Sequence, residues 1–515
     1  MNNLKLNPLD IPEILSLIGS FLDRKDILNC IRVSKTFHNV LVGSLWRIIN
    51  VCKSRYPASI ALQRHKGCIE EIRFEYDFVP EEFGSLRGCD RLQCIDYQGI
   101  SLSEPIHFLN LIKAHNSVIT RFLLKITLAW RELWEILLGC VNLNHLTALH
   151  TRIGDEVNIF FQVCKNVGYL GLFSVSIYQL PVDFLSNDYF FPNIHTLVMS
   201  DVRIASPPHP YTSSYCLGML VKRCPRLCTL HFDEKDEYLM VEQPSHSTFY
   251  KTTFLQHPWI LTSLSDVSIP SMYIKDEDMA ALLRQLTELR RLYTPACRFG
   301  QFSLKELLAT EQEVLDNGHI VRKRRLKRLC ETIKMLEFSK QSYVSGVVQA
   351  ILSNCPMLTL LRGSKITVTE IVNGAEWVST GLAELSIYLE ANIDQETADG
   401  MAKARIVFKQ LGKLTQLRFL SLTAWSLYDN GQQTLGLKLR AGLDELDKLK
   451  SLWGLRFQND GQQRIGLEEA TWIVNNWPCI RSLYGRMTPE LDGNQKDVNA
   501  LVYNFFSSHN IRIYI

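Results

Sequence analysis

Cysteine and histidine are the residue types whose spacing in this 515-residue chain could bind a metal ion. Cys224 and Cys228 are four positions apart, and His145 and His150 are five positions apart. A zinc site needs further ligands, and no matching His or Cys pair lies close to either couple in the sequence. We therefore expect ordinary core or surface residues at all four positions, with no metal and no cofactor.

Motifs for catalysis are also missing from the sequence. It has no Gly-rich phosphate loop, no G-x-S-x-G elbow and no H-E-x-x-H motif. Aspartates and glutamates are plentiful, but positions in a sequence cannot by themselves establish an acid/base couple. We therefore expect that the protein is not an enzyme. A hydrolase-like α/β enzyme is the least favoured alternative, because its strands would lead into glycine-rich active-site turns.

Composition limits the classes of partner. The net charge is only +3, which gives no reason to expect nucleic acid or an anionic membrane as the main partner. Hydrophobic residues make up 46% of the chain, enough for a large core. We find no signal peptide and no apolar stretch long enough to span a membrane, and we read the 14 cysteines as reduced thiols. These features predict a cytoplasmic protein, with the nucleus as an alternative location.

The first fifty residues contain signals for three helices. Asp10 can cap the first helix, with Pro12 in its first turn and Glu13 three residues after the cap. Its apolar residues recur at spacings of three and four, which places them on one face: Ile11, Ile14, Leu15, Ile18 and Leu22.

Two further helices follow in the same segment. Asp23 with Asp26 predicts the start of the second, Ser34 caps the third, and Gly43 is a plausible end for it. About forty residues bury too little surface to be stable alone. Their spare apolar face should therefore dock on a partner or on the rest of the chain.

The segment 6–49 combines these helix signals with an ordered set of apolar and acidic positions. They are Leu9, Ile11, Pro12, Glu13, Ile14, Leu15, Ile18, Phe21, Leu22, the acidic link Asp23 to Asp26, Ile27, Leu28, Val33, Ser34, Phe37, Leu41, Leu45 and Trp46. In this order they resemble an F-box. The segment departs from the usual F-box pattern by having Ile11 before the proline and Phe37 at an aromatic position often held by Trp, both of which keep an apolar side chain of similar bulk.

The F-box resemblance implies docking on a Skp-type adaptor, which links the protein to a cullin-based ubiquitin ligase of the SCF type. The residues expected to contact the adaptor are Pro12, Ile14, Leu15, Ile18, Leu28 and Phe37. The alternative is an N-terminal helical cap that packs on the domain behind it, in a repeat scaffold with no ligase role.

After a connecting segment at 50–66, one unit recurs through residues 67–515. It has a helix-like run, often a Cys or Pro, and then L-x-x-L-x-L, with spacings in or just above the ~20–29 residues of leucine-rich repeats. The units begin at Ile69, Leu92, Ile119, Leu143, Val167, Ile194, Leu227, Leu261, Leu286, Ile333, Leu358, Leu382, Leu417, Leu449 and Ile480, and the chain ends on Ile511 to Ile515.

The clearest copies, at 223–232, 354–361 and 476–483, look like the leucine-rich repeats that commonly follow an F-box. In each, the helix should end before the proline and a strand should follow. One unit cannot bury its own apolar side, so the units must stack. The expected fold is α/β: a three-helix F-box followed by an irregular leucine-rich-repeat solenoid, with a curved parallel sheet lined by helices.

Strand residues that face away from the core would form a long concave surface for an unidentified target protein. We expect large or charged outward residues to bind it. The candidates are His231, Tyr388, Phe419, Arg456 and Tyr484. This chain would then be the substrate-recognition subunit of the ligase.

Three segments interrupt the repeat: a turn-rich loop at 206–211, a polar insertion from Asp233 to about Thr253, and residues 305–328. The last ends in the basic run Arg322 to Arg328, which could be a nuclear import signal or a patch for an acidic partner. The favoured interpretation is the solvated face of a helix that leads to Leu329 and Ile333.

Overall fold

The computed structural model describes residues 8–53, 55–102, 105–128, 130–234, 244–256, 261–317, 319–340, 343–423, 433–457, 463, 465–487 and 496–514. The chain divides into two compact units, Met1–Leu227 and Cys228–Ile515, and each is described by itself. Across the described ranges, no helix combines the length and apolar character needed to cross a membrane.

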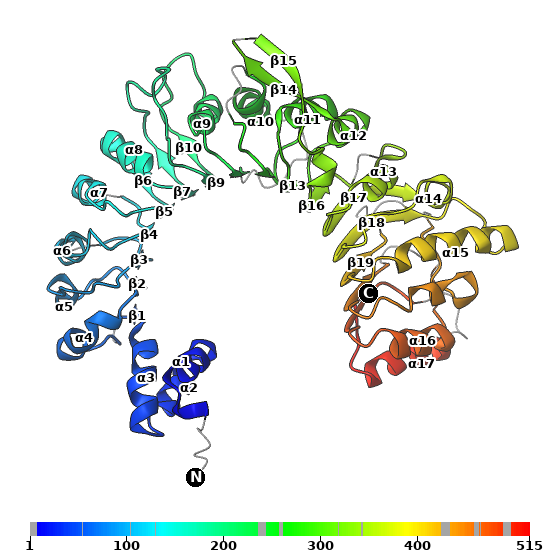
Figure 1. Ribbon diagram of the computed structural model, residues 1–515, viewed down its shortest axis with the longest axis horizontal. Helices are drawn as coiled ribbons and strands as arrows, with labels where there is room; N and C mark the ends of the chain where they lie inside the picture. The colour runs from blue at the N-terminus through cyan, green and yellow to red at the C-terminus, as the bar shows by residue number, and fades with distance from the viewer. Residues whose placement is uncertain are drawn as a thin grey trace, which may run out of the picture. The chain divides into compact units, whose positions relative to one another are not determined.

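The first unit opens with three helices, which follow a short 3-10 turn at Pro8–Asp10 (Figure 1). They are α1 (Pro12–Phe21), α2 (Arg24–Cys30) and α3 (Lys35–Trp46). Two predicted caps are confirmed: the Asp23 carboxylate accepts a hydrogen bond from the Asp26 N–H at 2.8 Å, and the Ser34 hydroxyl accepts one from the Phe37 N–H at 3.2 Å. Leu15, Ile27 and Leu41 are buried between the helices.

Two other predictions for this segment were wrong: that Asp10 caps the first helix and that Gly43 ends the third. The N-cap of α1 is Ile11 rather than Asp10, because Pro12 occupies the first helical position. Gly43 does not end α3, which continues to Trp46. The indole ring of Trp46 stacks on the imidazole of His65, with ring centroids 4.5 Å apart, and this contact holds the last turn of α3 in place.

Parallel strands then alternate with helices through the rest of the first unit. Strands pair in the order β1, β2, β3, β4, β5, β7, β9, and every pair is parallel. The strands are β1 (Ile48–Val51), β2 (Glu71–Phe74), β3 (Cys94–Tyr97), β4 (Arg121–Lys125), β5 (His145–Leu149), β7 (Tyr169–Phe173) and β9 (Thr196–Ser200). Short strands β6 (Arg152–Ile153), β8 (Ser176–Ile177) and β10 (Arg203–Ile204) form a second small parallel sheet.

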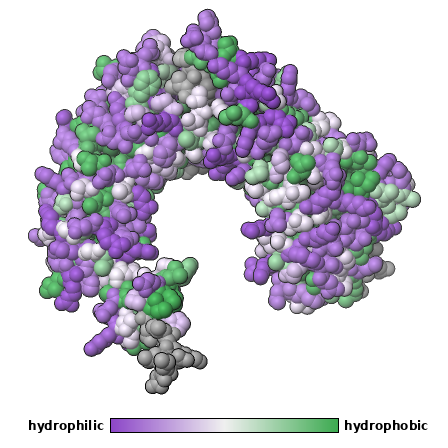
Figure 2. All heavy atoms as spheres, in the orientation of Figure 1, coloured by the Kyte–Doolittle hydropathy of each residue, from purple (hydrophilic) through white to green (hydrophobic). Residues whose placement is uncertain are grey.

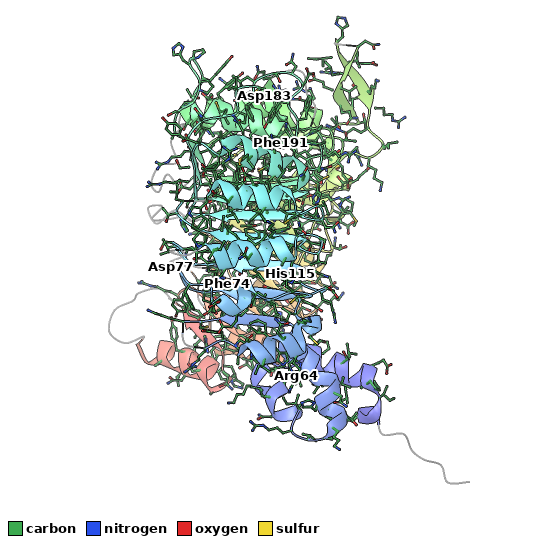
Figure 3. All side chains as sticks on the ribbon, turned by 90° about the vertical axis from the view of Figure 1, so that its left-hand side faces the viewer. Arg64, Phe74, Asp77, His115, Asp183 and Phe191 are labelled. Atoms are coloured by element: carbon green, nitrogen blue, oxygen red, sulfur yellow. The ribbon has the colours of Figure 1, made fainter. Side chains whose placement is uncertain are left out.

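Helices of the first unit stack along one face of its sheet (Figure 3). They are α4 (Ser59–His65), α5 (Glu81–Gly84), α6 (Ile106–Ala114), α7 (Arg131–Leu138), α8 (Val157–Asn166) and α9 (Ser213–Lys222). Between sheet and helices, Phe74 packs edge-to-face against Phe83 and Phe108, with centroids 5.5 and 5.9 Å apart. The core of this unit is therefore one continuous layer that each repeat shares with its neighbours.

The second unit repeats the same arrangement of parallel strands and helices (Figure 1). Its parallel strands pair in chain order: β11 (Thr229–Asp233), β12 (Asp266–Ser268), β13 (Arg291–Thr294), β16 (Met335–Phe338), β17 (Leu360–Thr367), β18 (Glu384–Glu390), β19 (Phe419–Ser421), β20 (Gly454–Arg456), β21 (Ser482–Tyr484) and β22 (Arg512–Tyr514). The helices are α10 (Pro244–Tyr250), which continues as a π-helical turn at Lys251–Leu255, α11 (Asp276–Gln285), α12 (Gln301–Leu308), α13 (Val347–Asn354), α14 (Val368–Asn373), α15 (Ala398–Gly412), α16 (Leu467–Asn476) and α17 (Lys496–Ser508). Residues 235–243 of the predicted polar insertion lie outside the described residues.

The predicted repeat is confirmed. All fifteen apolar residues expected to begin a unit, from Ile69 to Ile480, are buried, and each is followed shortly by a parallel strand. The helices before Pro356 and Pro478 end at the Asn that precedes each proline, Asn354 and Asn476, as expected, whereas the helix before Pro225 ends at Lys222, two residues before Cys224. The chain is an α/β protein with a long parallel sheet lined by helices, as predicted.

The basic run differs from the prediction. Arg322 to Arg324 lie on β15 (His319–Arg324), which forms an antiparallel hairpin with β14 (Glu311–Asp316), and not on a helix. The register sets acidic residues of β14 opposite basic residues of β15, Glu313 beside Arg322 and Glu311 beside Arg324, and Lys323 forms an ion pair with Asp316 at 2.9 Å. The favoured helical interpretation of this segment was therefore wrong.

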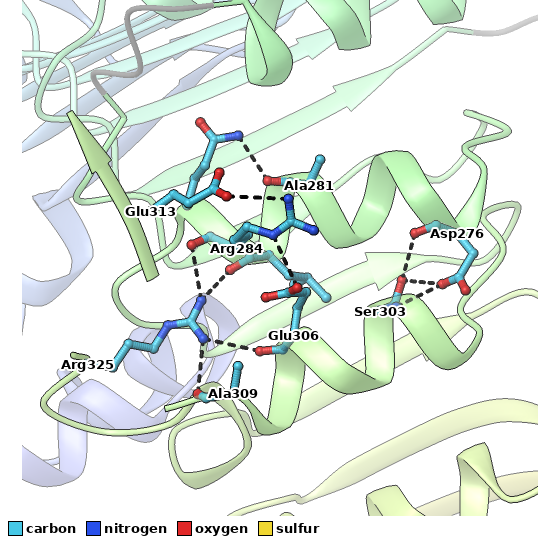
Figure 4. Close-up of polar contacts among 10 residues, drawn as sticks. Asp276, Ala281, Arg284, Ser303, Glu306, Ala309, Glu313 and Arg325 are labelled. Carbon is cyan, nitrogen blue, oxygen red and sulfur yellow. Dashed lines mark hydrogen bonds and ion pairs between the residues drawn. The ribbon is translucent and has the colours of Figure 1, made fainter. Parts of the chain in front are cut away.

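Arg325, the next residue, is buried at the ends of two helices (Figure 4). Its guanidinium donates to the carbonyls of Leu283 at 2.7 Å and Arg284 at 3.3 Å in α11, and of Glu306 at 3.2 Å in α12. It also donates to the carbonyls of Leu286 and Ala309, just after these helices. A positive charge at two helix C-termini satisfies carbonyls that have no partner within the helix. Burial nevertheless lowers the pKa of this guanidinium.

We expect Arg325→Leu to lower the free energy of unfolding by about 2–4 kcal/mol, because buried carbonyls would lose their donor. Arg324→Leu, at an exposed position one residue earlier, is the matched control and should change stability by no more than ~0.5 kcal/mol. Denaturant unfolding, with hydrogen exchange at the last turns of α11 and α12, measures the effect. Equal stability of the two variants would contradict the capping role.

Candidate protein-interaction surfaces

The predicted adaptor residues divide into exposed and buried groups. Pro12, Ile18 and Leu28 are exposed, while Ile14 and Phe37 are half-buried. Leu15 is fully buried, at 0% exposure. In this chain Leu15 therefore belongs to the core that holds the three helices together.

Three large apolar residues that were not among the predicted adaptor contacts are more exposed than Ile18, at 37%, and Leu28, at 39%. Leu17 is 62% exposed, Phe21 81% and Val33 69%. Figure 2 shows apolar atoms gathered over α1 and α2. The helical period contained the signal for two of them, because Leu17 and Phe21 are four residues apart and so share one face of α1 with the exposed Ile18.

The third helix joins this domain to the repeats. Residue Arg47 follows α3, and its carbonyl accepts hydrogen bonds from the N–H groups of Glu70 and Glu71 at 2.9 and 3.0 Å. Strand β1 then pairs with β2 in register, Ile49 beside Ile72. At Gly19 of α1, a Cβ would lie 2.5 Å from a methyl carbon of Leu41, so α1 and α3 pack closely. The exposed apolar residues of α1 and α2 are thus carried by helices that are fixed to the first repeat.

A second surface consists of strand residues in the second unit that point away from the helices. Strand register aligns them in two rows, because each strand contributes its first and third residues. One row is Thr229, Asp266, Arg291, Met335, Leu360, Glu384, Phe419, Gly454, Ser482 and Arg512. The other is His231, Ser268, Tyr293, Glu337, Arg362, Ser386, Ser421, Arg456, Tyr484 and Tyr514.

Three of the five predicted target-binding residues lie together on these rows. The guanidinium of Arg456 lies 4.8 Å from the ring centroid of Tyr484 and 5.8 Å from that of Phe419. The two rings are 6.2 Å apart, in edge-to-face contact. They form one cationic and aromatic cluster.

The other two predicted residues lie outside this cluster, His231 at the start of the same row and Tyr388 outside both rows. His231, on β11, contacts the hydroxyl of Ser268 at 2.8 Å, and burial lowers the pKa of its imidazole. Tyr388 lies further along β18, beside Lys365, and is only 6% exposed. The five residues therefore do not form a single site.

Charged side chains form a network at the centre of the second unit. Arg362 bridges Glu337 at 3.2 Å and Glu384 at 2.6 Å. The ammonium of Lys340 contacts the Ser386 hydroxyl at 3.1 Å, and burial lowers the pKa of Lys340 to about 8, although Glu337 opposes the shift. The positive and negative charges of this region largely pair with one another.

In the first unit, outward residues are also paired. The carboxylate of Glu71 on β2 forms ion pairs with Arg73 at 2.5 Å and with Arg121 at 3.7 Å. His145 stacks on Tyr169, with ring centroids 3.8 Å apart, so its imidazole packs against an aromatic neighbour. Burial lowers the pKa of His145.

The Cys and His pairs considered in the sequence analysis, for which no metal was expected, can now be placed in the described part of the chain. No three His, Cys, Asp or Glu side chains there are placed to hold an ion. Cys224 is buried and its thiol has a raised pKa because of that burial, whereas Cys228 is exposed. His150 is exposed as well.

Comparison with known proteins adds a family match at the N-terminus. Residues 12–52 match the model of the F-box-like family. No curated protein gives a significant match to the sequence.

Several solved structures of repeat proteins are similar to the chain. A leucine-rich-repeat protein of Leptospira interrogans is 13% identical, covers 90% of this chain and 100% of its own, and gives a TM-score of 0.41. An internalin of Listeria monocytogenes is 12% identical, with 84% and 89% coverage and a TM-score of 0.36. Drosophila Toll in its complex with Spätzle is 13% identical, with 86% and 54% coverage and a TM-score of 0.41. Each TM-score is below 0.5, so the repeat fold rests on the strand pairing described above.

The helical segment and the repeats are covalently continuous but differ in type. The first consists of three short helices with an exposed apolar face, and the second consists of parallel strands with alternating buried leucines. The chain therefore carries an F-box-like domain at residues 12–52, followed by leucine-rich repeats.

Proposed function

We propose that this protein is the substrate-recognition subunit of an SCF-type cullin ubiquitin ligase. Its F-box-like domain docks on a Skp-type adaptor, and its repeats bind a target protein. The observation that supports this role is the apolar patch on the F-box-like domain, which we define as Leu17, Ile18, Phe21, Leu28 and Val33. The role implies a cytoplasmic or nuclear location.

The size of the apolar patch suits a partner helix or groove. Each large apolar side chain that becomes fully buried contributes about 1.5–3 kcal/mol. A few such residues at the centre of an interface supply most of its binding energy. Phe21 and Leu17, the two most exposed large apolar residues of α1, are therefore the main anchors of the proposed adaptor contact.

In this role the protein performs no bond chemistry of its own. Holding a target and the ligase machinery on one chain raises the effective concentration of the target near the transfer machinery. The contact of α3 with the first repeat limits motion between the F-box-like domain and the strand surface of the first unit.

The alternative is a repeat scaffold in which the three helices only cap the first repeat. A cap needs an apolar side toward the repeat, and Trp46 on His65 supplies such a contact. It does not need a second apolar side toward solvent. The exposed patch therefore favours a partner-binding role, since contiguous exposed apolar surface often marks an interaction site.

We expect Phe21→Asp combined with Leu28→Asp to abolish capture of a purified Skp-type adaptor, because two charges would have to be buried in the contact. Ile60→Asp is the matched control: Ile60 is 79% exposed on α4, outside the apolar patch, and its replacement should leave capture unchanged. Biolayer interferometry with the full-length chain measures the difference. Failure of the intact chain to capture the adaptor would exclude the ligase role.

Leu15 should behave differently from the exposed residues. We expect Leu15→Ala to lower the stability of the three-helix domain by about 2–5 kcal/mol, because it leaves a cavity between α1 and α3. Leu17→Ala should change stability by no more than ~0.5 kcal/mol and yet weaken adaptor capture. Hydrogen exchange in α1 to α3 together with adaptor titration separates the two effects; equal loss of protection in both variants would argue against this division.

A further inference from the structure

Strands β19 to β22 carry a surface unlike the rest of the second unit, which we call the arginine–aromatic surface. Its arginines are Arg456, Arg481 and Arg512. Its aromatic residues are Phe419, Trp453, Tyr484 and Tyr514. All lie at the outward first or third position of a strand or at the residue just before one.

Ring contacts join these residues across the four strands. The rings of Phe419 and Trp453 are 5.3 Å apart, and those of Tyr484 and Tyr514 stack at 4.8 Å. Arg456 lies against Phe419 and Tyr484, as described above. Large flat side chains held in contact by their neighbours lose little conformational entropy on binding, which suits them to act as anchors.

Beside these rings lies a hollow of about 990 Å³. Trp453, Arg481, Arg512 and Tyr514 line it from the strand side, and Tyr503 of α17 lines it from the helix side. The two arginines are exposed at this hollow, so their guanidinium groups are accessible to an incoming chain.

The three arginines carry positive charges that could pair with a negatively charged partner. Within the described residues, none of the three forms an ion pair, and the Nε of Arg456 is buried without a hydrogen-bond partner. No Asp or Glu occupies an outward position of β19 to β22 or the residue just before these strands. Guanidinium groups form charge-assisted, often bidentate hydrogen bonds with carboxylates, so the exposed Arg481 and Arg512 can each pair with an acidic side chain.

Acidic residues limit the surface on one side. Glu384 on β18 lies beside Phe419 in the strand register, and Glu337 lies two strands further on, on β16. Both already pair with Arg362. A long polyanion that continued along the sheet would meet these carboxylates, whereas a short acidic segment would not.

We propose that the arginine–aromatic surface binds a short, acidic segment of a protein, whose Asp or Glu side chains pair with the arginines while its apolar side chains pack on the rings. This inference rests on the proposed function, because it names the chemical class of the target segment that the repeats recognise. Charge complementarity and the boundary at Glu384 favour a peptide over a nucleic acid.

The test is a selection of random short peptides displayed on phage against the purified full-length chain. We expect the selected peptides to be enriched in Asp and Glu relative to the starting library, and their binding to weaken at high salt. In fluorescence anisotropy, Arg481→Glu combined with Arg512→Glu should weaken binding of a selected peptide by at least about tenfold.

Arg290→Glu is the matched control, because Arg290 directly precedes β13 as Arg481 precedes β21, and it is also exposed. It should leave peptide binding unchanged, and thermal unfolding should show that both variants are folded. The proposal is overturned if no peptide is selected, if the selected peptides are not acidic, or if the double variant binds them equally well. Tighter binding of single-stranded RNA than of the peptides, lost in the same double variant, would also overturn it.

Adaptor capture by the same preparations separates this inference from the proposed function. The double variant should capture the Skp-type adaptor as the intact chain does, because its substitutions lie outside the F-box-like domain. If the intact chain binds acidic peptides but no adaptor, the ligase role fails and the peptide site stands. If the intact chain captures the adaptor but selects no acidic peptide, the peptide site fails and the ligase role stands.

Discussion

Burial of the repeated leucines between sheet and helices is the constraint on which the structure depends. A single strand–helix unit exposes one apolar side on each flank, and only a neighbouring unit of the same kind can cover it. Buried residues such as Leu92, Leu227 and Leu417 provide this contact in successive repeats. Because the leucines take the inward positions, the outward positions of the strands are free to vary, and they carry the arginines and aromatic rings of the proposed target site.

The three N-terminal helices follow the opposite rule. Their core is only a few residues deep, with Leu15, Ile27 and Leu41 at its centre, and α3 supports the domain by running into β1. Leu17, Ile18, Phe21 and Leu28 of α1 and α2 stay on the surface. An F-box-like domain on a repeat array thus separates two kinds of apolar surface: one that is buried between repeats, and one that remains available to a partner.

Local sequence signals predicted the repeat fold well, because each one has a short-range cause. Pro225, Pro356 and Pro478 end helices by geometry alone, and Asp23 and Ser34 cap helices that begin within three residues. The alternation of leucines sets which strand residues face outward. These signals do not depend on distant parts of the chain.

What the sequence could not predict depends on contacts between distant residues. Leu15 has the same spacing as its exposed neighbours, and only the packing of α1 on α3 shows that it is buried. Arg325 stands in a run of like charges, yet its acceptors are carbonyls near residues 283–286 and 306–309. Phe419, Arg456 and Tyr484 meet only because strand register aligns three separate repeats.

The hairpin of β14 and β15 has a consequence for which parts of this chain can change without disturbing the repeats. The hairpin pairs with itself, while β13 and β16, on either side of it in the sequence, pair directly with Leu292 beside Leu336. Arg325 secures the point where the chain returns to the repeat. Apart from Glu313, which pairs with Arg284 of α11, the hairpin can therefore lengthen or shorten without altering the register of β13 and β16, as an appendage on an intact scaffold.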